Sequence, residues 1–504
     1  MRRLPIPSVV AALMFLWSCT VPVRQRSFTT APSSLNRSAH YLKAHLKNGD
    51  LYLLSDWTVD AEEKNVTGTG GHYDANRRVI ERGAVTLPID SVALFETNVV
   101  SKSKRVAALS VMTGVTAAVA VVCIASPKAC FGSCPTFYAM DGDKWSLQAE
   151  GFSASVAPAL EDTDLDALYR VHPATSRFTL RMTNEALETH VIRSVRLIAA
   201  PRPANGRVFA TADRQFWASS RVEPPLECRA SEGDCRDAVR EFDGVERFSA
   251  ADPHDLSRHE TIDLRFAPRS GDAPVGVVIA ARQTLLSTFL FYQTLAYLGT
   301  RATAVLASVE SDGGSVREPA AGMSQLLGGI DVLVEQAGGW RNVATFRETG
   351  PLATDVRLLP IPREAARSGH VRLRLTRGLW RLDYVALARM DKRVEPVVLS
   401  AAEVRQGGEI VEVKSGATVT TLPGDVYDFT FNLPGWPEQQ ELFLESRGYY
   451  LEWMRDEWVR EESRLRAAMI FFAPHLALRV LAPQFKAMEP QIESQFWSSR
   501  YATH

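Results

Sequence analysis

Apolar and polar residues alternate along much of this chain with the two-residue period of β-strands. Residues 41–46 and 51–53 both show this alternation, and Asn48-Gly49 lies between them. Asn-Gly is a preferred pair for the tight type I′ turn of a hairpin. We therefore predict a β-hairpin here, within a small β-barrel that covers residues 39–100.

The same pattern returns in the middle of the chain. Residues 136–140 and 145–149 are strand-like and flank an Asp-Gly turn, which predicts a second hairpin. Alternation of this kind is typical of antiparallel sheets that bury one face. We predict a β-rich domain over residues 130–325 and a β-sandwich domain over residues 326–435.

Two segments depart from the strand pattern. Residues 106–126 carry no charged side chain, which predicts an apolar helix that is long enough to be a transmembrane candidate. Residues 436–504 are rich in helix-forming and aromatic residues and predict a helical tail, which Pro474, Pro483 and Pro490 divide into short helices. The expected fold class is mainly β, of the α+β type.

The N-terminus has the architecture of an export signal, because Arg2 and Arg3 precede a short apolar run. The run ends in Leu16-Trp17-Ser18-Cys19, which resembles the bacterial lipobox, where a small residue precedes the lipid-modified cysteine. The resemblance implies a signal peptide over residues 1–18, a lipid anchor on Cys19 and a flexible tether over residues 19–38. An uncleaved anchor helix and an unmodified secretory signal are the alternatives.

A lipid anchor predicts a membrane protein of the bacterial cell envelope that faces the periplasm. The apolar residues 106–126 complicate this picture, because Lys102, Lys104 and Arg105 precede them and only Lys128 follows. In a simple span, the more basic side would be cytoplasmic. We therefore expect an exported C-terminal part, with this segment buried, lying along the membrane or re-entering it as a second membrane contact.

The cysteines beyond the anchor are spaced for local disulfides. Cys130 and Cys134 form one close pair, and Cys228 and Cys235 close a polar loop that has no apolar anchor. Disulfides persist in exported proteins, so both pairs are disulfide candidates. A zinc site is the alternative interpretation, but the pairs lack two-residue spacing and have no histidine at ligand spacing. We expect no metal and no cofactor.

Three local patterns resemble known proteins. Residues 133–145, Ser-Cys-Pro-Thr-Phe-Tyr-Ala-Met-Asp-Gly-Asp-Lys-Trp, resemble a segment of uncharacterised bacterial lipoproteins and envelope proteins, which implies exported β-rich architecture and no known activity. The strand rhythm of residues 39–100 is similar to that of SH3-like and Sm-like barrels. Gly-Gly-Trp-Arg-Asn-Val at residues 338–343 is similar to the rhythm of galactose-binding-like jelly rolls.

Composition and motifs restrict the function. A hydrophobic content of 46%, a charged content of 23% and a net charge of -1 are those of an ordinary globular protein without a nucleic-acid surface. The common nucleophile-elbow, zinc-protease, P-loop and dinucleotide motifs do not occur in the sequence. We therefore predict no catalytic residues and a non-catalytic envelope lipoprotein that binds another envelope protein or a glycan.

Trp380, Asp383 and Tyr384 are the candidate glycan contacts, because an aromatic face beside a carboxylate suits a sugar. The other interpretation of these residues is a strand with one salt-bridged aspartate. The alternative function is an envelope enzyme that acts on glycan or peptidoglycan, with Asp383 or Asp425 as general acid or base.

Overall fold

The computed structural model describes residues 21–103 and 134–499, apart from residues 30–31, 47–49, 61, 63, 74–78, 157, 187, 270–272, 303–316, 337–338, 348–349, 412–417, 423 and 453–459. The expected signal peptide over residues 1–18, the anchor Cys19, the apolar residues 106–126 and Cys130 lie outside the described residues. The chain divides into two compact units, Met1–Ala125 and Ser126–His504. Antiparallel sheets dominate both, which confirms the expected mainly β, α+β fold class.

The N-terminal unit is built on one antiparallel sheet with the strand order β1-β6-β2-β3-β4-β5. Its strands are β1 (Val21–Thr29), β2 (Tyr41–Leu46), β3 (Leu51–Val59), β4 (Asn65–Tyr73), β5 (Val79–Pro88) and β6 (Val92–Ser103). The predicted hairpin is confirmed, because β2 and β3 pair antiparallel. The alternate residues Leu42, Ala44 and Leu54 are fully buried and pack with Phe95 in the core of this unit.

Strand β1 corrects part of the expected tether. Residues 21–29 pair with β6 along their whole length, from Val21 opposite Ser103 to Thr29 opposite Phe95. A strand at the edge of a sheet offers unpaired N–H and C=O groups to any neighbouring extended segment. Val21, Val23 and Phe28 favour the extended conformation, so this segment adds a strand to the sheet.

The C-terminal unit contains five antiparallel sheets within the described ranges. The first, β28-β27-β30-β10-β7-β8, consists of β7 (Thr136–Asp141), β8 (Lys144–Glu150), β10 (Arg177–Thr183), β27 (Glu403–Gln406), β28 (Glu409–Ile410) and β30 (Val426–Asn432). The second, β26-β11-β31-β9 with β29 beside β11, consists of β9 (Asp162–Ala167), β11 (Glu188–Pro201), β26 (Val397–Ser400), β29 (Val419–Thr421) and β31 (Gln440–Glu452). The third consists of β12 (Arg207–Ala210), β13 (Phe216–Ser219) and β25 (Lys392–Val394).

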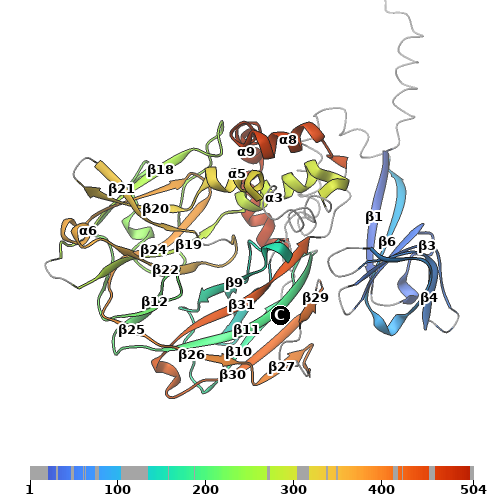
Figure 1. Ribbon diagram of the computed structural model, residues 1–504, viewed down its shortest axis with the longest axis horizontal. Coiled ribbons are helices and arrows are strands. Elements are labelled where there is room, and N and C mark those ends of the chain that lie inside the picture. The colour runs from blue at the N-terminus through green and yellow to red at the C-terminus, as the bar shows by residue number, and fades with distance from the viewer. Residues whose placement is uncertain are drawn as a thin grey trace, which may run out of the picture. The chain divides into compact units, whose positions relative to one another are not determined.

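The remaining two sheets lie in the same unit (Figure 1). The fourth, β14-β24-β19-β22 with β17 beside β24, consists of β14 (Val222–Glu223), β17 (Arg247–Phe248), β19 (Val275–Gln283), β22 (Asp355–Ile361) and β24 (Trp380–Arg389). The fifth, β16-β15-β18-β23-β20-β21, consists of β15 (Glu227–Ala230), β16 (Gly233–Asp234), β18 (His259–Arg265), β20 (Ile330–Gln336), β21 (Gly339–Phe346) and β23 (His370–Thr376).

The second sheet is buried on both faces. Leu197 and Leu444 belong to a core that is shared with the first sheet. Their chain neighbours Ile198 and Phe443 belong to another core, which is shared with the third and fourth sheets. Successive side chains of a strand point to opposite faces, so this sheet is the middle layer of a β-sandwich-like arrangement.

Strand pairing crosses the domain boundaries expected from the sequence. β10 pairs with β30, and β18 pairs with β23, so residues 130–325 and 326–435 contribute to the same sheets. β31 pairs with β11 and lies within the expected helical tail, residues 436–504. The helical prediction is therefore wrong for Gln440–Glu452. β31 is buried on both faces and contains consecutive apolar residues as well as buried glutamates, so it lacks the alternation that marks a half-buried strand.

The helices of the C-terminal unit are α3 (Leu285–Leu298), α5 (Arg317–Leu327), α6 (Arg363–Ser368), α8 (Arg464–Phe472) and α9 (Pro474–Ser499). α8 packs against α3, α5 and α9. Pro474 occupies the first position of α9, where a backbone N–H would have no hydrogen-bond partner within the helix. Pro483 and Pro490 lie inside α9 and do not end it. Among the described residues no single helix is long and apolar enough to cross a membrane. Only Arg464–Phe472 and Pro474–Ile492 taken together, with a bend of 120° between them, have that length and composition.

Short 3-10 turns complete the described elements. They are η1 (Pro32–Ser34), η2 (Ile89–Ser91), η4 (Pro158–Leu160), η5 (Arg236–Ala238), η6 (Gly299–Arg301) and η7 (Pro437–Gln439). Helix α3 follows β19 almost directly, and the Thr284 side chain caps it by accepting a hydrogen bond from the Leu286 N–H at 3.2 Å. This cap fixes the point at which the chain leaves the fourth sheet and enters the helical layer.

Candidate functional site

A cavity of about 810 Å³ lies where the helices meet the ends of several strands. Helices α3, α5 and α8 contribute to its wall, together with residues at the ends of β8, β11, β24 and β31. Figure 1 shows these helices gathered beyond one end of β31. All of the lining residues belong to the C-terminal unit, so the cavity is a feature of that unit alone.

Helix α3 supplies much of the apolar wall through Leu290, Phe291, Leu295 and Leu298. Most residues of this helix are buried, and apolar residues lie around nearly its whole circumference. A helix of this kind has protein or a cavity on every side and no solvated face. α3 therefore contributes to the protein core on some sides and to the cavity on another.

Polar side chains form a second part of the lining, and Cys134, Glu150, Glu188 and Tyr450 belong to it. Cys134 is buried and carries a free thiol. Burial raises the pKa of this thiol well above its usual range, and the nearby carboxylates of Glu150 and Glu188 raise it further. The thiol therefore stays protonated at neutral pH, which makes Cys134 a poor nucleophile.

The acidic and phenolic groups of the lining are held by hydrogen bonds within the protein. Glu188 Oε1 lies 2.9 Å from His190 Nε2, and both side chains are fully buried. The Tyr450 hydroxyl donates to a backbone carbonyl at 3.1 Å, and burial raises the pKa of Tyr450 well above its usual range. The Tyr292 hydroxyl donates to Glu452 Oε1 at 2.9 Å. These bonds fix the polar part of the wall.

Trp380 contributes a buried donor to the lining. Its side chain is 1% exposed, and its indole Nε1–H has no hydrogen-bond partner among the described residues. An indole nitrogen can only donate, and a buried donor without an acceptor costs roughly 1 to 3 kcal/mol.

The structure does not place Trp380, Asp383 and Tyr384 on an exposed sugar-binding surface, which corrects the expectation of a glycan contact. Trp380 is buried and packs edge-on against Phe346, with ring centroids 5.7 Å apart. Asp383 is fully buried, where it pairs with Arg170 at 2.8 Å. The interpretation as a strand with one salt-bridged aspartate is confirmed, and the reason is that β24 lies within the fourth sheet rather than at the surface.

Asp383 and Asp425, the candidate general acid or base of the alternative function, also have hydrogen-bond partners within the protein. Asp383 accepts a hydrogen bond from the Gly244 N–H at 2.8 Å, and Asp425 accepts one from the Leu422 N–H at 2.8 Å. Burial raises the pKa of both carboxyl groups. Neither residue belongs to the lining of the 810 Å³ cavity.

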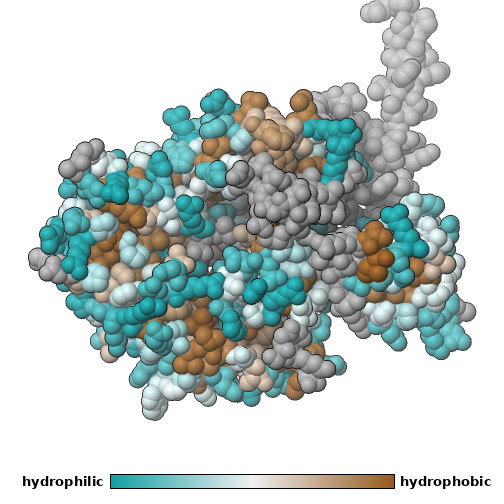
Figure 2. Space-filling model, in the orientation of Figure 1, coloured by the Kyte–Doolittle hydropathy of each residue, from teal (hydrophilic) through white to brown (hydrophobic). Residues whose placement is uncertain are grey.

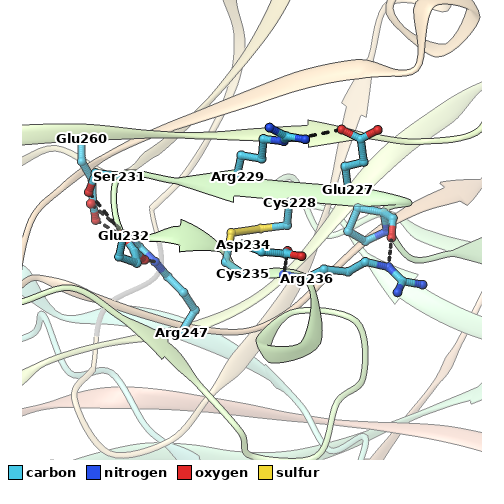
Figure 3. The surroundings of a disulfide bond; sticks show 11 residues. Glu227, Cys228, Arg229, Ser231, Glu232, Asp234, Cys235, Arg236, Arg247 and Glu260 are labelled. Atoms are coloured by element: carbon cyan, nitrogen blue, oxygen red, sulfur yellow. Dashed lines mark hydrogen bonds and ion pairs between the residues drawn. A yellow bond between two sulfur atoms is a disulfide. The ribbon is translucent and has the colours of Figure 1, made fainter.

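The disulfide between Cys228 and Cys235 is confirmed (Figure 3). It closes the turn between β15 and β16, and the Cys235 N–H also donates to the Cys228 carbonyl at 2.9 Å. The free thiol of Cys134 contradicts the other expected disulfide, with Cys130, which lies outside the described residues. Cys134 directly precedes the first sheet and packs in its core, so burial and not cross-linking accounts for this cysteine.

The disulfide loop is tied to a buried charge network. Glu232 in the loop accepts a hydrogen bond from Arg247 Nε at 2.7 Å. The remaining nitrogens of Arg247 donate to the two carboxylate oxygens of Glu260 at 2.6 and 2.9 Å. Figure 3 shows Arg247 between the two glutamates. Arg247 and Glu260 are both buried, so this bidentate pair is part of the interior.

Searches of protein-family models, curated proteins and solved structures gave no match to this chain. Across the described ranges, no group of three or more His, Cys, Asp or Glu side chains is arranged to hold a metal ion. The cavity was not predicted from the sequence, because its lining comes from segments as distant as Cys134 and Phe471. The all-round apolarity of α3 was the one local signal that could have indicated it.

Proposed function

We propose that this chain is a non-catalytic, lipid-anchored binding protein of the bacterial cell envelope, and that an amphiphilic small molecule occupies the cavity. The observation that carries the proposal is the cavity of about 810 Å³ with a mainly apolar wall. Ligand sites in proteins have volumes of roughly 300 to 1,000 Å³, with apolar walls and a few placed polar groups. The cavity matches that description in size and in chemistry.

The lining favours a ligand with an apolar body and a small polar group. Leu290, Phe291 and Leu295 suit an aliphatic chain or a ring, because burying apolar surface is favourable by about 25 cal/mol per Å². Polar residues of the lining, among them Glu150, Gln325 and Glu452, suit a small polar group on the ligand. A glycan, one of the two partners expected from the sequence beside another envelope protein, has hydroxyl groups over its whole surface, and most of this wall could not satisfy them.

Binding is better supported than catalysis by the state of the polar groups. The pKa of Cys134 is raised and its thiol is neutral, so it lacks the thiolate that nucleophilic chemistry needs. Glu188 and His190 face each other as a buried pair, and Tyr292 is bonded to Glu452. These groups hold the wall together, which is what a preformed binding site requires.

A cavity-filling variant tests the proposal. Leu295 lines the cavity and is 2% exposed, so Leu295→Trp places a larger side chain in the space. A fluorescent long-chain fatty acid is the probe, and its emission is titrated with the full chain in the absence of vesicles. We expect Leu295→Trp to weaken binding by roughly tenfold or more, since it removes most of the apolar contact of one ligand segment. Val398→Trp, at a 51% exposed position on β26, is the matched control and should bind as the unmodified chain does.

Hydrogen exchange of helix α3 provides a second readout that requires no substitution. Leu290, Phe291 and Leu295 line the cavity, so saturating fatty acid should slow amide exchange in Leu285–Leu298, measured by mass spectrometry. Equal probe affinity in Leu295→Trp and the unmodified chain would contradict the proposal. So would an exchange rate of these amides that saturating fatty acid leaves unchanged.

A further inference from the structure

Helices α8 and α9 each expose two large apolar side chains. Leu465 is 82% exposed and Phe472 is 80% exposed on α8, and Leu476 and Val480 are 53% and 43% exposed on α9. We call these four residues the α8–α9 corner. Figure 2 shows hydrophobic residues gathered over the region where Figure 1 draws α8 and α9. Large apolar side chains that gather at a surface are typical of interaction sites.

The corner is additional to the face that the two helices bury. Ala467 and Ile470 on α8, and Leu478 and Leu481 on α9, are buried against the rest of the unit. An ordinary surface helix has such an apolar face on the inside and polar residues on the outside. In α8 and in the first turns of α9 the outside is apolar as well, so folding of the unit does not explain these side chains.

The charge of this segment is one-sided. Residues 464–488 contain Arg464, Arg466, Arg479, Lys486 and His475 and no aspartate or glutamate, although Glu461, Glu462 and Glu489 flank them. Arg479 lies 3.4 Å from Asp255 but remains 66% exposed, and Lys486 pairs with Glu489. Basic residues beside exposed aliphatic and aromatic residues are the composition of helices that lie in the interface of an anionic membrane.

We infer that the α8–α9 corner docks on the surface of a bilayer that contains anionic lipid. Leu465 and Phe472 make few contacts with the rest of the protein. Fluid lipid can surround such side chains on all sides, whereas a rigid protein surface would need a matching pocket for each. This inference does not rest on the proposed cavity ligand, because it concerns a different surface.

Hydrogen exchange on the full chain tests the inference at the level of single segments. The chain is added to vesicles of phosphatidylcholine and phosphatidylglycerol in equal parts, and separately to vesicles of phosphatidylcholine alone. We expect the amides of residues 464–480 to exchange several-fold more slowly on the anionic vesicles. Phe472→Glu should remove this difference, since burying one phenylalanine changes a partition constant by roughly tenfold or more.

Ile410→Glu is the matched control, because Ile410 is 65% exposed on β28 and far from this segment in the sequence. All variants keep the same N-terminal segment, so attachment through that segment is equal among them. Equal exchange of residues 464–480 on both kinds of vesicle would overturn the inference. So would slowing that survives Phe472→Glu, or slowing that appears without vesicles as the chain concentration rises, which would indicate a protein partner. The fatty-acid titration contains no vesicles, so its result is independent of this one.

Discussion

Removal of the Cys228–Cys235 disulfide should destabilise the C-terminal unit by an amount that follows from the size of its loop. The two cysteines are separated by 7 positions in the sequence. The loop-entropy relation gives roughly 2 to 3 kcal/mol for a loop of this length, because the cross-link restricts the unfolded chain. Both cysteines are buried, so the double variant Cys228→Ala/Cys235→Ala avoids placing new polar groups in the interior.

The disulfide also holds Glu232 beside Arg247. The free energy of that contact must be separated from the free energy that the cross-link contributes by closing the loop. Glu232 is 44% exposed, so its bond with Arg247 is worth less than about 1 kcal/mol after screening by solvent. The single variant Glu232→Gln therefore serves as the control for the double cysteine variant. It removes the charge from the contact and leaves the cross-link in place.

The assay is urea unfolding of the oxidised full chain and of both variants, followed by near-ultraviolet circular dichroism, with thiols counted by mass spectrometry. We expect the double variant to lose roughly 2 to 3 kcal/mol and Glu232→Gln to lose less than about 1 kcal/mol. Equal urea midpoints for the two variants would contradict this prediction. So would free thiols at both positions in the unmodified protein purified without reducing agents.

Three further changes have expected outcomes. Arg247→Met leaves Glu260 buried without its bidentate partner, so urea unfolding should show a loss of roughly 3 to 5 kcal/mol, and a loss below about 1 kcal/mol would contradict this. Burial raises the pKa of Asp425 above 3.8, so the folded state binds this proton more tightly and loses stability as pH rises through the folded pKa. The melting temperature of Asp425→Asn minus that of the unmodified chain should therefore increase as pH rises from about 4 to neutrality. A difference that does not change with pH would argue against this. Cys19→Ser should abolish incorporation of labelled palmitate, and unchanged labelling would remove the lipobox interpretation.

The parts of the fold that sequence predicted are those that short-range patterns specify. Both hairpins were predicted because strand alternation and an Asn-Gly or Asp-Gly turn lie within a dozen residues of each other. The strand β31 was misassigned to a helical tail because its residues do not alternate. Leu442, Phe443 and Leu444 are apolar in succession, Glu441 and Glu445 are buried, and only the position of β31 between β9 and β11 explains this pattern. The expected boundary near residue 325 failed because β18 pairs with β23 across it.

The candidate site was harder to predict for the same reason. Trp380 was identified as a chemically useful residue, but its role as a buried donor in a cavity wall depends on α3 and α8, which are distant in the sequence. Cys134 was assigned to a disulfide from its spacing to Cys130, whereas its surroundings are those of a buried thiol. Spacing along the chain indicates which residues can meet, and packing decides which of them do.

Helix α8 connects the two proposals, because two consecutive phenylalanines serve different surfaces. Phe471 lines the cavity, whereas Phe472 is 80% exposed at the α8–α9 corner. If the corner lies in a membrane, then one wall of the cavity stands at the lipid surface, and an amphiphile could enter from the bilayer without crossing water. Loading of a fluorescent fatty acid from anionic vesicles should then slow in Phe472→Glu while its affinity in vesicle-free solution stays unchanged. If Ile410→Glu slows loading equally, the effect comes from surface charge in general, and the proposed route from the bilayer into the cavity is contradicted.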